Sequence, residues 1–461
     1  MPQPVPADLI RARFSDALSA MYGCEVPLYA QLLELVHDVN GRAMAADPAL
    51  GAMVEAAGGL AAFNREPHGA IRVGKPDELA ALRRVFAVMG MYPVGYYDLS
   101  VAGVPVHSTA FRPVDRASLG VNPLRIFCSL LRLELIEDED LRATAADLLA
   151  SREILTPRAH ELVARAEAEG GLVEEEVDTF VAEVLETFRW REKARVTAAT
   201  YRRLLGAHRL VADIVAFQGP HINHLTPRTL DIDAAQAEMV ARAIKAKAVI
   251  EGPPRRHVDI LLRQTSFQAL EEEITFLGAD GGPEEKGSHM ARFGEIEQRG
   301  AALTPKGRAL YDALLDEARG LEGSSGGDYA ARLAALFERF PDDLDTLRRE
   351  GLAYFDYALS AQGHDALASG HRVPADLEAC IAAGLVSATP MVYEDFLPVS
   401  AAGIFQSNLG LEERGAYAGH SSQAAFEEAL GARVADPFAL YAALEAQARD
   451  AVLARLHGAR A

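Results

Sequence analysis

Two histidine-bearing segments and one acidic segment contain the side chains best suited to chemistry in this sequence. His68 lies in NREPHGAIR, and His221 and His224 lie in GPHINHLTPRT, a loop-like segment flanked by Pro and Gly. Glu295 and Glu297 lie in RFGEIEQRG, where the alternation of a strand would place both carboxylates on one face. Imidazole and carboxylate groups together can hold a transition metal, provided that the fold brings these distant segments to one place.

Two interpretations of these residues remain open at the level of sequence. The residue types alone favour the structural one, in which both glutamates face solvent on an amphipathic strand and the loop histidines hold no ligand. The other is a triad of two histidines and one carboxylate, which holds Fe(II) on one face and leaves three positions open for substrate and O₂. This second interpretation requires a sheet on which the three segments converge.

Arg72 in the His68 segment and Ser400 in a later segment could also contact a ligand. Arg72 follows His68 by four residues and shares a face with it in either a strand or a helix. Its guanidinium could hold a carboxylate bidentately near a metal, or it could form a surface salt bridge, and the sequence leaves both open. Ser400 lies among small and apolar residues with Gly403 nearby, which suits either close approach of a ligand or tight packing.

Other chemistries lack a motif in this sequence. It has no HExxH, no zinc-finger spacing of cysteines, and no EF-hand glycine or terminal glutamate in DIDAAQAE. The glycine-rich patterns GxGxxG and GxxxxGK[ST] for nucleotides are also missing. GSSGG at 323–327 matches the letters of the hydrolase pattern GxSxG, but it is a Ser/Gly-rich loop without the strand-turn-helix context that this motif needs. Nucleotide cofactors and a serine-hydrolase mechanism therefore have no support from motifs.

Composition narrows the range of partners. Acidic residues outnumber basic ones by 66 to 46, which gives the 461-residue chain a formal charge of −20. A surface of this charge repels phosphate backbones and anionic lipid head groups, so neither nucleic acid nor membrane is an expected partner. A small anionic substrate fits only where a local arginine or a metal outweighs the overall field.

The sequence predicts a cytoplasmic globular protein. Hydrophobic residues make up 49% of it, which is enough for a sizeable core, but charged residues interrupt each apolar run well before the length of a membrane span. The three cysteines are widely spaced and form no disulfide framework, and no secretory signal is visible.

Helical and strand-like patterns alternate along the sequence and predict an α+β fold. Apolar spacings of three and four residues predict helical blocks at 1–55, 138–205, 305–380 and 411–461. Alternating patterns predict β modules near 60–136 and 210–300, with a strand-rich piece at 391–408. Ile214–Phe217 is one of the expected strands. No clear linker separates these groups, so we expect one composite domain over 1–461.

Four segments taken together resemble one enzyme family. NREPHGAIR, GPHINHLTPRT, HMARFGEIEQRGAALTPKGR and YEDFLPVSAAGIFQSN, in this order, resemble the 2-oxoadipate dioxygenase/decarboxylase family, whose members are also called hydroxyglutarate synthases. The family belongs to the vicinal-oxygen-chelate superfamily, and GEIEQR is also similar to the carboxylate strand of hydroxyphenylpyruvate dioxygenases. The resemblance extends over nearly the whole chain.

The resemblance implies both a fold and a metal site. The implied fold has vicinal-oxygen-chelate-like βαβββ modules that form a central curved sheet around the site, with large helical insertions. The implied ligands of Fe(II) are His68, His224 and Glu295, and the superfamily pattern favours Glu295 over Glu297.

The resemblance also implies a reaction. It converts 2-oxoadipate, a small 2-oxo diacid, and O₂ to (R)-2-hydroxyglutarate and CO₂ in lysine catabolism. Arg72, Val399 and Ser400 match the substrate-contacting residues of the family. Two alternatives remain: a non-oxidative metal-dependent isomerase or lyase of the same superfamily that acts on a 2-oxo acid, and a non-catalytic binding protein that has kept the fold.

Overall fold

The computed structural model describes residues 3–56, 59–65, 68–320, 326–369, 373–397 and 422–458. Contacts along the chain divide it into two compact units. The first comprises Met1–Glu251, Gln264–Gln298 and Phe396–Ala435, and the second comprises Gly252–Arg263, Arg299–Asp395 and Asp436–Ala461. The single composite domain that the sequence suggests therefore stays a prediction.

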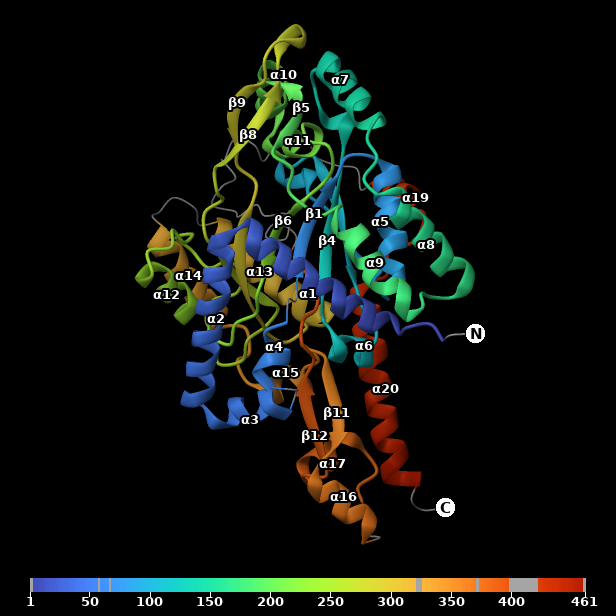
Figure 1. Ribbon diagram of the computed structural model, residues 1–461. Coiled ribbons are helices and arrows are strands. Elements are labelled where there is room, and N and C mark those ends of the chain that lie inside the picture. Colours follow the sequence, from blue (N-terminus) through green and yellow to red (C-terminus); the bar gives the residue numbers. More distant parts are fainter. Residues whose placement is uncertain are drawn as a thin grey trace. The chain divides into compact units, whose positions relative to one another are not determined.

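A seven-stranded sheet with the order β2-β3-β4-β1-β6-β10-β7 forms the centre of the first unit (Figure 1). Its strands are β1 His68–Val73, β2 Tyr92–Asp98, β3 Val106–Arg112, β4 Arg125–Leu131, β6 Ile222–Thr226, β7 Leu262–Ser266 and β10 Phe293–Arg299. β1, the helix α5 (Pro76–Val88), β2, β3 and β4 follow one another as a βαβββ module. A second module consists of β6, the helix α12 (Ile232–Ala241), β7 and β10.

The two modules join where β1 runs antiparallel to β6. The opening strand of each module pairs in parallel with the closing strand of the same module, β1 with β4 and β6 with β10. Both opening strands therefore lie side by side in the sheet, with a closing strand on each side. This arrangement confirms the predicted α+β class and brings the His68 and His224 segments together.

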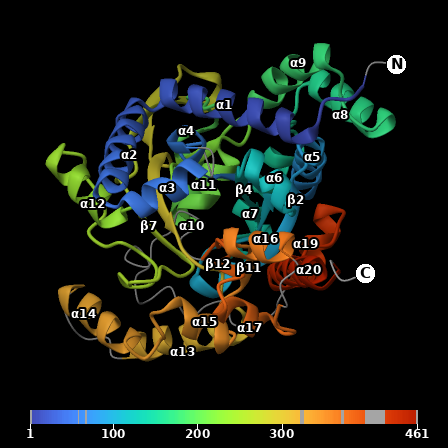
Figure 2. The same ribbon diagram turned by 90° about the horizontal axis from the view of Figure 1, so that it is seen from below.

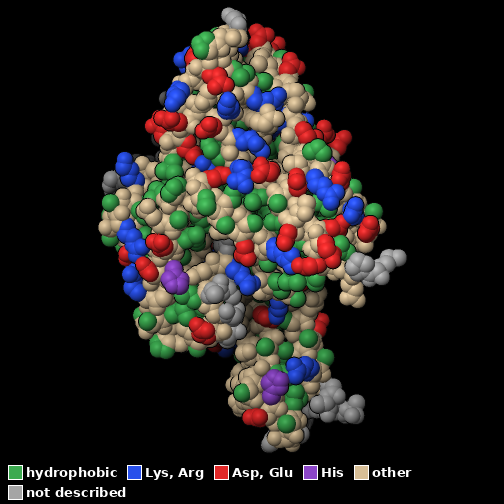
Figure 3. Space-filling view, in the orientation of Figure 1, with side chains coloured by type: hydrophobic (Ala, Val, Ile, Leu, Met, Phe, Trp, Pro, Cys, Tyr) green, Lys and Arg blue, Asp and Glu red, His purple; other side chains and the backbone are tan. Residues whose placement is uncertain are grey.

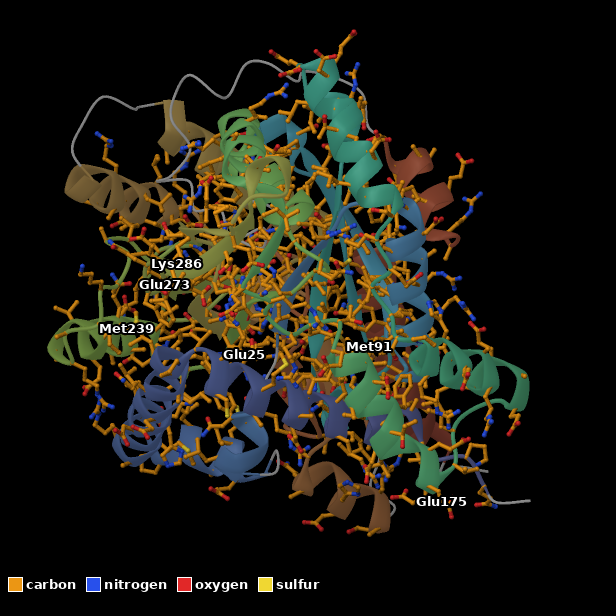
Figure 4. All side chains as sticks on the ribbon, turned by 45° about the horizontal axis from the view of Figure 1, so that its top comes forward. Glu25, Met91, Glu175, Met239, Glu273 and Lys286 are labelled. Carbon is orange, nitrogen blue, oxygen red and sulfur yellow. The ribbon has the colours of Figure 1, made fainter. Side chains whose placement is uncertain are left out.

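A βαβββ module has four strands, but the second module contributes only β6, β7 and β10 to this sheet. Two strands that lie between β7 and β10 in the chain, β8 (Glu272–Leu277) and β9 (Glu285–His289), instead join β5 (Lys193–Thr197) in a separate three-stranded sheet. Side chains of β8 alternate between buried and exposed, which suits a sheet with one open face. Glu273 of β8 and Lys286 of β9 form an exposed ion pair, with Nζ of Lys286 3.7 Å from Oε2 of Glu273 (Figure 4).

Helices bury one face of the large sheet (Figure 2). Ile71 of β1, Ile126 of β4 and Ile296 of β10 project into a core that they share with Phe14 of α1 (Ala7–Glu25) and Leu32 of α2 (Pro27–Ala46). Because side chains alternate along a strand, the neighbouring positions point to the opposite face. The candidate metal ligands His68 of β1 and Glu295 of β10 lie on this opposite face.

Most other elements of both units are helical. In the first unit these are α3 Pro48–Ala56, α4 Gly59–Phe63, α6 Arg116–Val121, α7 Glu139–Ala150, α8 Pro157–Glu169, α9 Glu174–Leu185, α10 Ala198–Ala207, α11 Arg209–Val215 and α19 Gln423–Leu430. In the second unit they are α13 Pro305–Gly320, α14 Gly326–Phe337, α15 Leu344–Arg349, α16 Ala361–Ala368, α17 Leu377–Ala382 and α20 Pro437–Gly458, with the hairpin strands β11 Phe355–Leu359 and β12 Val386–Pro390.

Two features of the helices and the surface concern membrane spans and surface charge. Across the described ranges, every helix is too short or too polar to traverse a bilayer. Acidic and basic side chains are interspersed on the face that Figure 3 shows.

Two expected strands differ from the structure. The prediction of a strand over Ile214–Phe217 is wrong, since Ile214 and Val215 end the helix α11 and only Phe217 forms an isolated bridge. The helix begins after His208, whose side chain accepts a hydrogen bond from the N–H of Leu210. A short apolar run fits a buried helix as well as a strand, and periodicity does not separate the two. Within the described part of 391–408, residues 391–397 contain only an isolated bridge at Val392, and residues 398–408 lie outside the described residues.

Gly294 of β10 provides a test of how closely the helix-covered face is packed. A Cβ at Gly294 would lie 2.4 Å from Cε1 of Phe267 and 2.8 Å from Cδ2 of Leu32. Gly294→Ala is expected to lower the free energy of unfolding by about 1–3 kcal/mol, because the added methyl group must displace a core side chain or the strand. Urea unfolding measures this loss.

Gly23→Ala is the matched control for that substitution. Gly23 lies in α1, and a Cβ there meets nothing within 4 Å. The control is expected to leave stability unchanged or to raise it by up to about 1 kcal/mol through helix propensity. Equal unfolding free energies for the two variants would contradict the packing at Gly294.

Candidate metal centre

Three side chains from neighbouring strands meet on the large sheet. His68 begins β1, His224 lies in β6 and Glu295 lies in β10, and all three are fully buried. Nε2 of His68 lies 3.1 Å from Nε2 of His224 and 3.5 Å from Oε2 of Glu295. Nε2 of His224 lies 3.7 Å from the same glutamate oxygen. The structure thus brings together the three residues that the resemblance implies as ligands.

The spacing of these three atoms fits a metal ion. Ligand atoms about 2.1 Å from one ion lie about 3.0–3.4 Å from each other when they share one face of an octahedron or tetrahedron. The observed separations of 3.1 to 3.7 Å are close to this range. Among the residues that the structure describes, this is the one group of three such side chains whose ligand atoms all lie within 4.8 Å of one another. Two imidazoles and a carboxylate suit Fe(II), and the same set can accept Zn(II).

A bulge in β6 directs His224 toward this group. The pairing with β1 shifts register between His224 and Ile222, so that Asn223 is the extra residue. Ile222 and Leu225 consequently both pack in the helix-covered core. His224 then projects from the opposite face with a fixed direction.

Glu297 contacts the Nδ1 side of the His68 ring, whereas Nε2 faces the triad. Oε2 of Glu297 lies 3.0 Å from Nδ1 of His68, and its Oε1 accepts a hydrogen bond of 3.4 Å from the guanidinium of Arg125. A carboxylate at Nδ1 favours the tautomer with the proton on that atom, which leaves the Nε2 lone pair for a cation. Both Glu295 and Glu297 are fully buried, so the interpretation of a solvent-facing pair is wrong.

Two neutral donors orient Glu295. Its Oε2 accepts a hydrogen bond of 3.2 Å from Oγ1 of Thr226 and one of 2.9 Å from Nε2 of Gln264. Thr226 comes from β6 and Gln264 from β7, so the strands on both sides of β10 hold this carboxylate. Such contacts fix the direction of a ligand oxygen before a metal binds.

The surroundings favour a neutral His224. Burial, together with the nearby charges of His68 and Arg72, holds the pKa of His224 well below its ordinary value. Phe293 stacks on the His224 ring with centroids 4.7 Å apart, and Phe396 meets His68 edge-on at 4.7 Å. A neutral imidazole held between apolar groups is the form that binds a metal.

Arg72 and His221 both contact Asp213 of α11. Nη1 of Arg72 lies 2.7 Å from Oδ2 of Asp213, and this pair is buried, so a surface salt bridge is not what Arg72 forms. Nε2 of His221 lies 3.3 Å from Oδ1 of Asp213, away from the triad. Val399 and Ser400, the two other predicted substrate contacts, lie outside the described residues.

Several residues of this region were not found from the sequence. They are Arg125, Asp213, Thr226, Gln264 and His289. Arg125 in NPLRIFC and Asp213 in LVADIVAF share one usable signal, a charged residue inside an otherwise apolar run. Such a residue is buried with its neighbours and needs a partner there. Thr226, Gln264 and His289 carry no comparable local signal.

These observations define an α+β protein with a buried site of two histidines and one carboxylate where its two β modules meet. The family model described as 2-oxoadipate dioxygenase/decarboxylase matches residues 14–408. The chain therefore belongs to the 2-oxoadipate dioxygenase/decarboxylase family.

Relatives in this family are similar over almost the whole chain. The 2-oxoadipate dioxygenase/decarboxylase of Pseudomonas putida is 55% identical over 452 residues, which cover 97% of both chains. That of Escherichia coli is 54% identical over 449 residues, covering 97% of this chain and 99% of the relative. The crystal structure of the hydroxyglutarate synthase from Pseudomonas putida in complex with 2-oxoadipate matches with a TM-score of 0.90 and 53% identity, over 99% of this chain and 100% of that one.

Removal of one candidate ligand should abolish metal binding. His224→Ala leaves two protein ligands, and we expect the protein loaded anaerobically with Fe(II) and then desalted to drop from about one ion per chain to less than about a tenth. Elemental analysis measures the content. His37→Ala, which removes an exposed histidine of α2, is the control and should retain the wild-type content. Full occupancy in His224→Ala would refute the metal site.

Glu297→Gln tests the contact between the Glu297 carboxylate and Nδ1 of His68. The neutral amide still reaches Nδ1 but no longer fixes the tautomer, so the dissociation constant for the metal should rise about 10–100-fold. Competition with a chelator of known affinity measures this change. Glu273→Gln on the outer face of β8 is the matched control and should leave the affinity unchanged, because Glu273 is exposed (Figure 4). The same affinity in both variants would mean that Glu297 does not tune His68.

Proposed function

We propose that this chain is an Fe(II)-dependent dioxygenase/decarboxylase that converts 2-oxoadipate and O₂ to (R)-2-hydroxyglutarate and CO₂ in lysine catabolism. The observation that carries the proposal is the convergence of His68, His224 and Glu295 in a chain 55% identical to a 2-oxoadipate dioxygenase/decarboxylase. The reaction is balanced, since the substrate loses one carbon as CO₂ and both atoms of O₂ enter the two products.

The site residues have distinct tasks in this reaction. Fe(II) bound by the triad would supply open coordination positions for a 2-oxo acid and O₂ together with the electrons that activate O₂. His68 and His224 act as neutral donors, while Glu295 contributes one negative charge. The site with a divalent ion thus keeps a net positive charge that attracts an anionic keto acid. Phe293 and Phe396 limit the access of water to the two imidazoles.

Arg72 is suited to bind the distal carboxylate of 2-oxoadipate. 2-Oxoadipate has a carboxylate beside its keto group and a second carboxylate at the other end of the chain. Arg72 lies four residues after His68 on the same face of β1, and its planar guanidinium can hold a carboxylate bidentately. We assign the keto-acid end to the triad and the distal carboxylate to Arg72, with Val399 and Ser400 as further predicted substrate contacts.

We also assign the enzyme to the cytoplasm. Cys24, Cys128 and Cys380 are all free thiols. Cysteines that form no disulfides are typical of proteins in reducing compartments.

Gas and product measurements test the reaction. With Fe(II) loaded anaerobically and 2-oxoadipate added, we expect one O₂ consumed and one CO₂ released for each (R)-2-hydroxyglutarate formed. An oxygen electrode, CO₂ capture and chiral chromatography give the three amounts, and protein loaded with Zn(II) is the control without redox chemistry. Turnover of the keto acid with no uptake of O₂ would replace the proposal by the isomerase or lyase alternative.

A further inference from the structure

Asp213 of α11 is the centre of a buried polar cluster close to the triad. Its Oδ1 lies 3.0 Å from Nε2 of His289 and 3.3 Å from Nε2 of His221. Its Oδ2 accepts hydrogen bonds of 2.7 Å from Nη1 of Arg72 and 3.3 Å from Nδ2 of Asn223. All five side chains are buried. A carboxylate has about four lone-pair directions, so these contacts use its accepting capacity.

The contacts of Asp213 form a hydrogen-bonding cluster and not a second metal centre. Within the described part of the chain, only the triad has three ligand atoms within 4.8 Å of one another. Each partner of Asp213 carries an N–H that can donate to the carboxylate. Burial raises the pKa of Asp213, but the opposing charges of His221 and Arg72 and the bonds from both histidines hold it well below its ordinary value. Asp213 is therefore an anion.

The cluster is attached to the same two strands that carry the histidine ligands. Arg72 follows His68 on β1, and Asn223 precedes His224 on β6, where the bulge turns it away from regular pairing. Arg72 projects from the same face of β1 as His68, four residues further along the strand. Asp213 thus connects both ligand strands to α11.

Aromatic groups fix the two histidines of the cluster. The ring of Trp190 meets His221 edge-on with centroids 4.7 Å apart and stacks on His289 at 5.8 Å. Oη of Tyr201 lies 2.7 Å from Nδ1 of His289, so both nitrogens of that ring have partners. With neighbours on every side, these side chains hold the carboxylate of Asp213 in one orientation.

We propose that Asp213 is a positioning residue that, with His289 and His221, fixes the Arg72 guanidinium for substrates that have a second carboxylate. The inference rests on the proposed function, in which Arg72 binds the distal carboxylate. A guanidinium is planar, so one nitrogen held by Asp213 also sets the plane in which the other N–H groups donate. Fixing a long, flexible side chain before binding reduces the entropy that the substrate must otherwise offset.

The test compares two substrates that differ only in the distal group. The ratio of kcat/KM for 2-oxoadipate to kcat/KM for 2-oxohexanoate, a monoacid of equal length, reports the use of the second carboxylate. Asp213→Asn is expected to lower this ratio about tenfold or more, mainly through a higher KM for the diacid. Metal content and kcat/KM for the monoacid should change less than about threefold. A loss that is equal for both substrates would overturn the proposal, because a merely structural role predicts that result.

Glu78→Gln is the matched control for loss of a buried carboxylate. Glu78 pairs with Arg152 through both oxygens at 2.7 and 2.6 Å, and this pair is as deeply buried as the one at Asp213. The control should lower thermal stability and leave the substrate ratio unchanged. His289→Gln is the second test variant, in case Asp213→Asn does not fold. It should lower the ratio several-fold, and an unchanged ratio in this variant would also overturn the proposal.

A double-mutant cycle separates this inference from the proposed function. Arg72→Ala should lower the ratio on its own, and Asp213→Asn should lower it no further in that background if Asp213 acts through Arg72. A lowered ratio in Arg72→Ala with a wild-type ratio in Asp213→Asn would refute the positioning role alone. An unchanged ratio in Arg72→Ala would instead refute the assignment of the distal carboxylate to Arg72.

Discussion

The burial of two carboxylates on one strand is the constraint that determines how this region is built. Glu295 and Glu297 are both fully buried on β10, and an uncompensated carboxylate in a protein interior costs several kcal/mol. Arg125 offsets the charge of Glu297, and His68 lies on its other oxygen. Glu295 faces the two imidazoles of the triad, and a divalent ion bound there would offset its charge. The site is therefore arranged for a cation, and the neutral donors of Thr226 and Gln264 only refine its orientation.

The sheet meets this constraint by giving each strand two functions. Alternation sends Ile71 and Ile296 into the helix-covered core, and sends His68 and Glu295, which lie on the same strands, to the site. In β6, Ile222 and Leu225 are three residues apart, so regular alternation would place them on opposite faces of the sheet. The bulge at Asn223 lets both side chains pack in the helix-covered core while His224 projects to the site. Core packing and ligand direction are consequently coupled in this sheet, since a shift of β1 or β10 for either reason moves both sets of side chains.

The sequence predicted the triad better than it predicted its surroundings. Segment resemblance was sufficient to pick out His68, His224 and Glu295, because the motifs are long and occur in a fixed order. Residue type alone gives the wrong interpretation of Glu297, because an alternating strand does not reveal which face is open to solvent. Glu297 and Ile296, on opposite faces of β10, are both fully buried. The four-residue run Ile214–Phe217 was too short for its period to separate strand from helix. Only the folded chain brings Asp213 into contact with side chains of β1, β6 and β9.

The two buried clusters of the first unit are electrically different, and this difference matches the substrate. Arg72 and Asp213 form a pair without net charge, which makes burial of the guanidinium tolerable in a chain of charge −20. The triad with a divalent ion has a net positive charge, which suits the end of a 2-oxo acid that carries both a carboxylate and a keto oxygen. A distal carboxylate that approaches Arg72 meets a guanidinium already shared with Asp213, so its binding depends more on orientation than on charge. If Arg72 binds the distal carboxylate, as proposed, selectivity for diacids requires that the guanidinium be held in place as well as present.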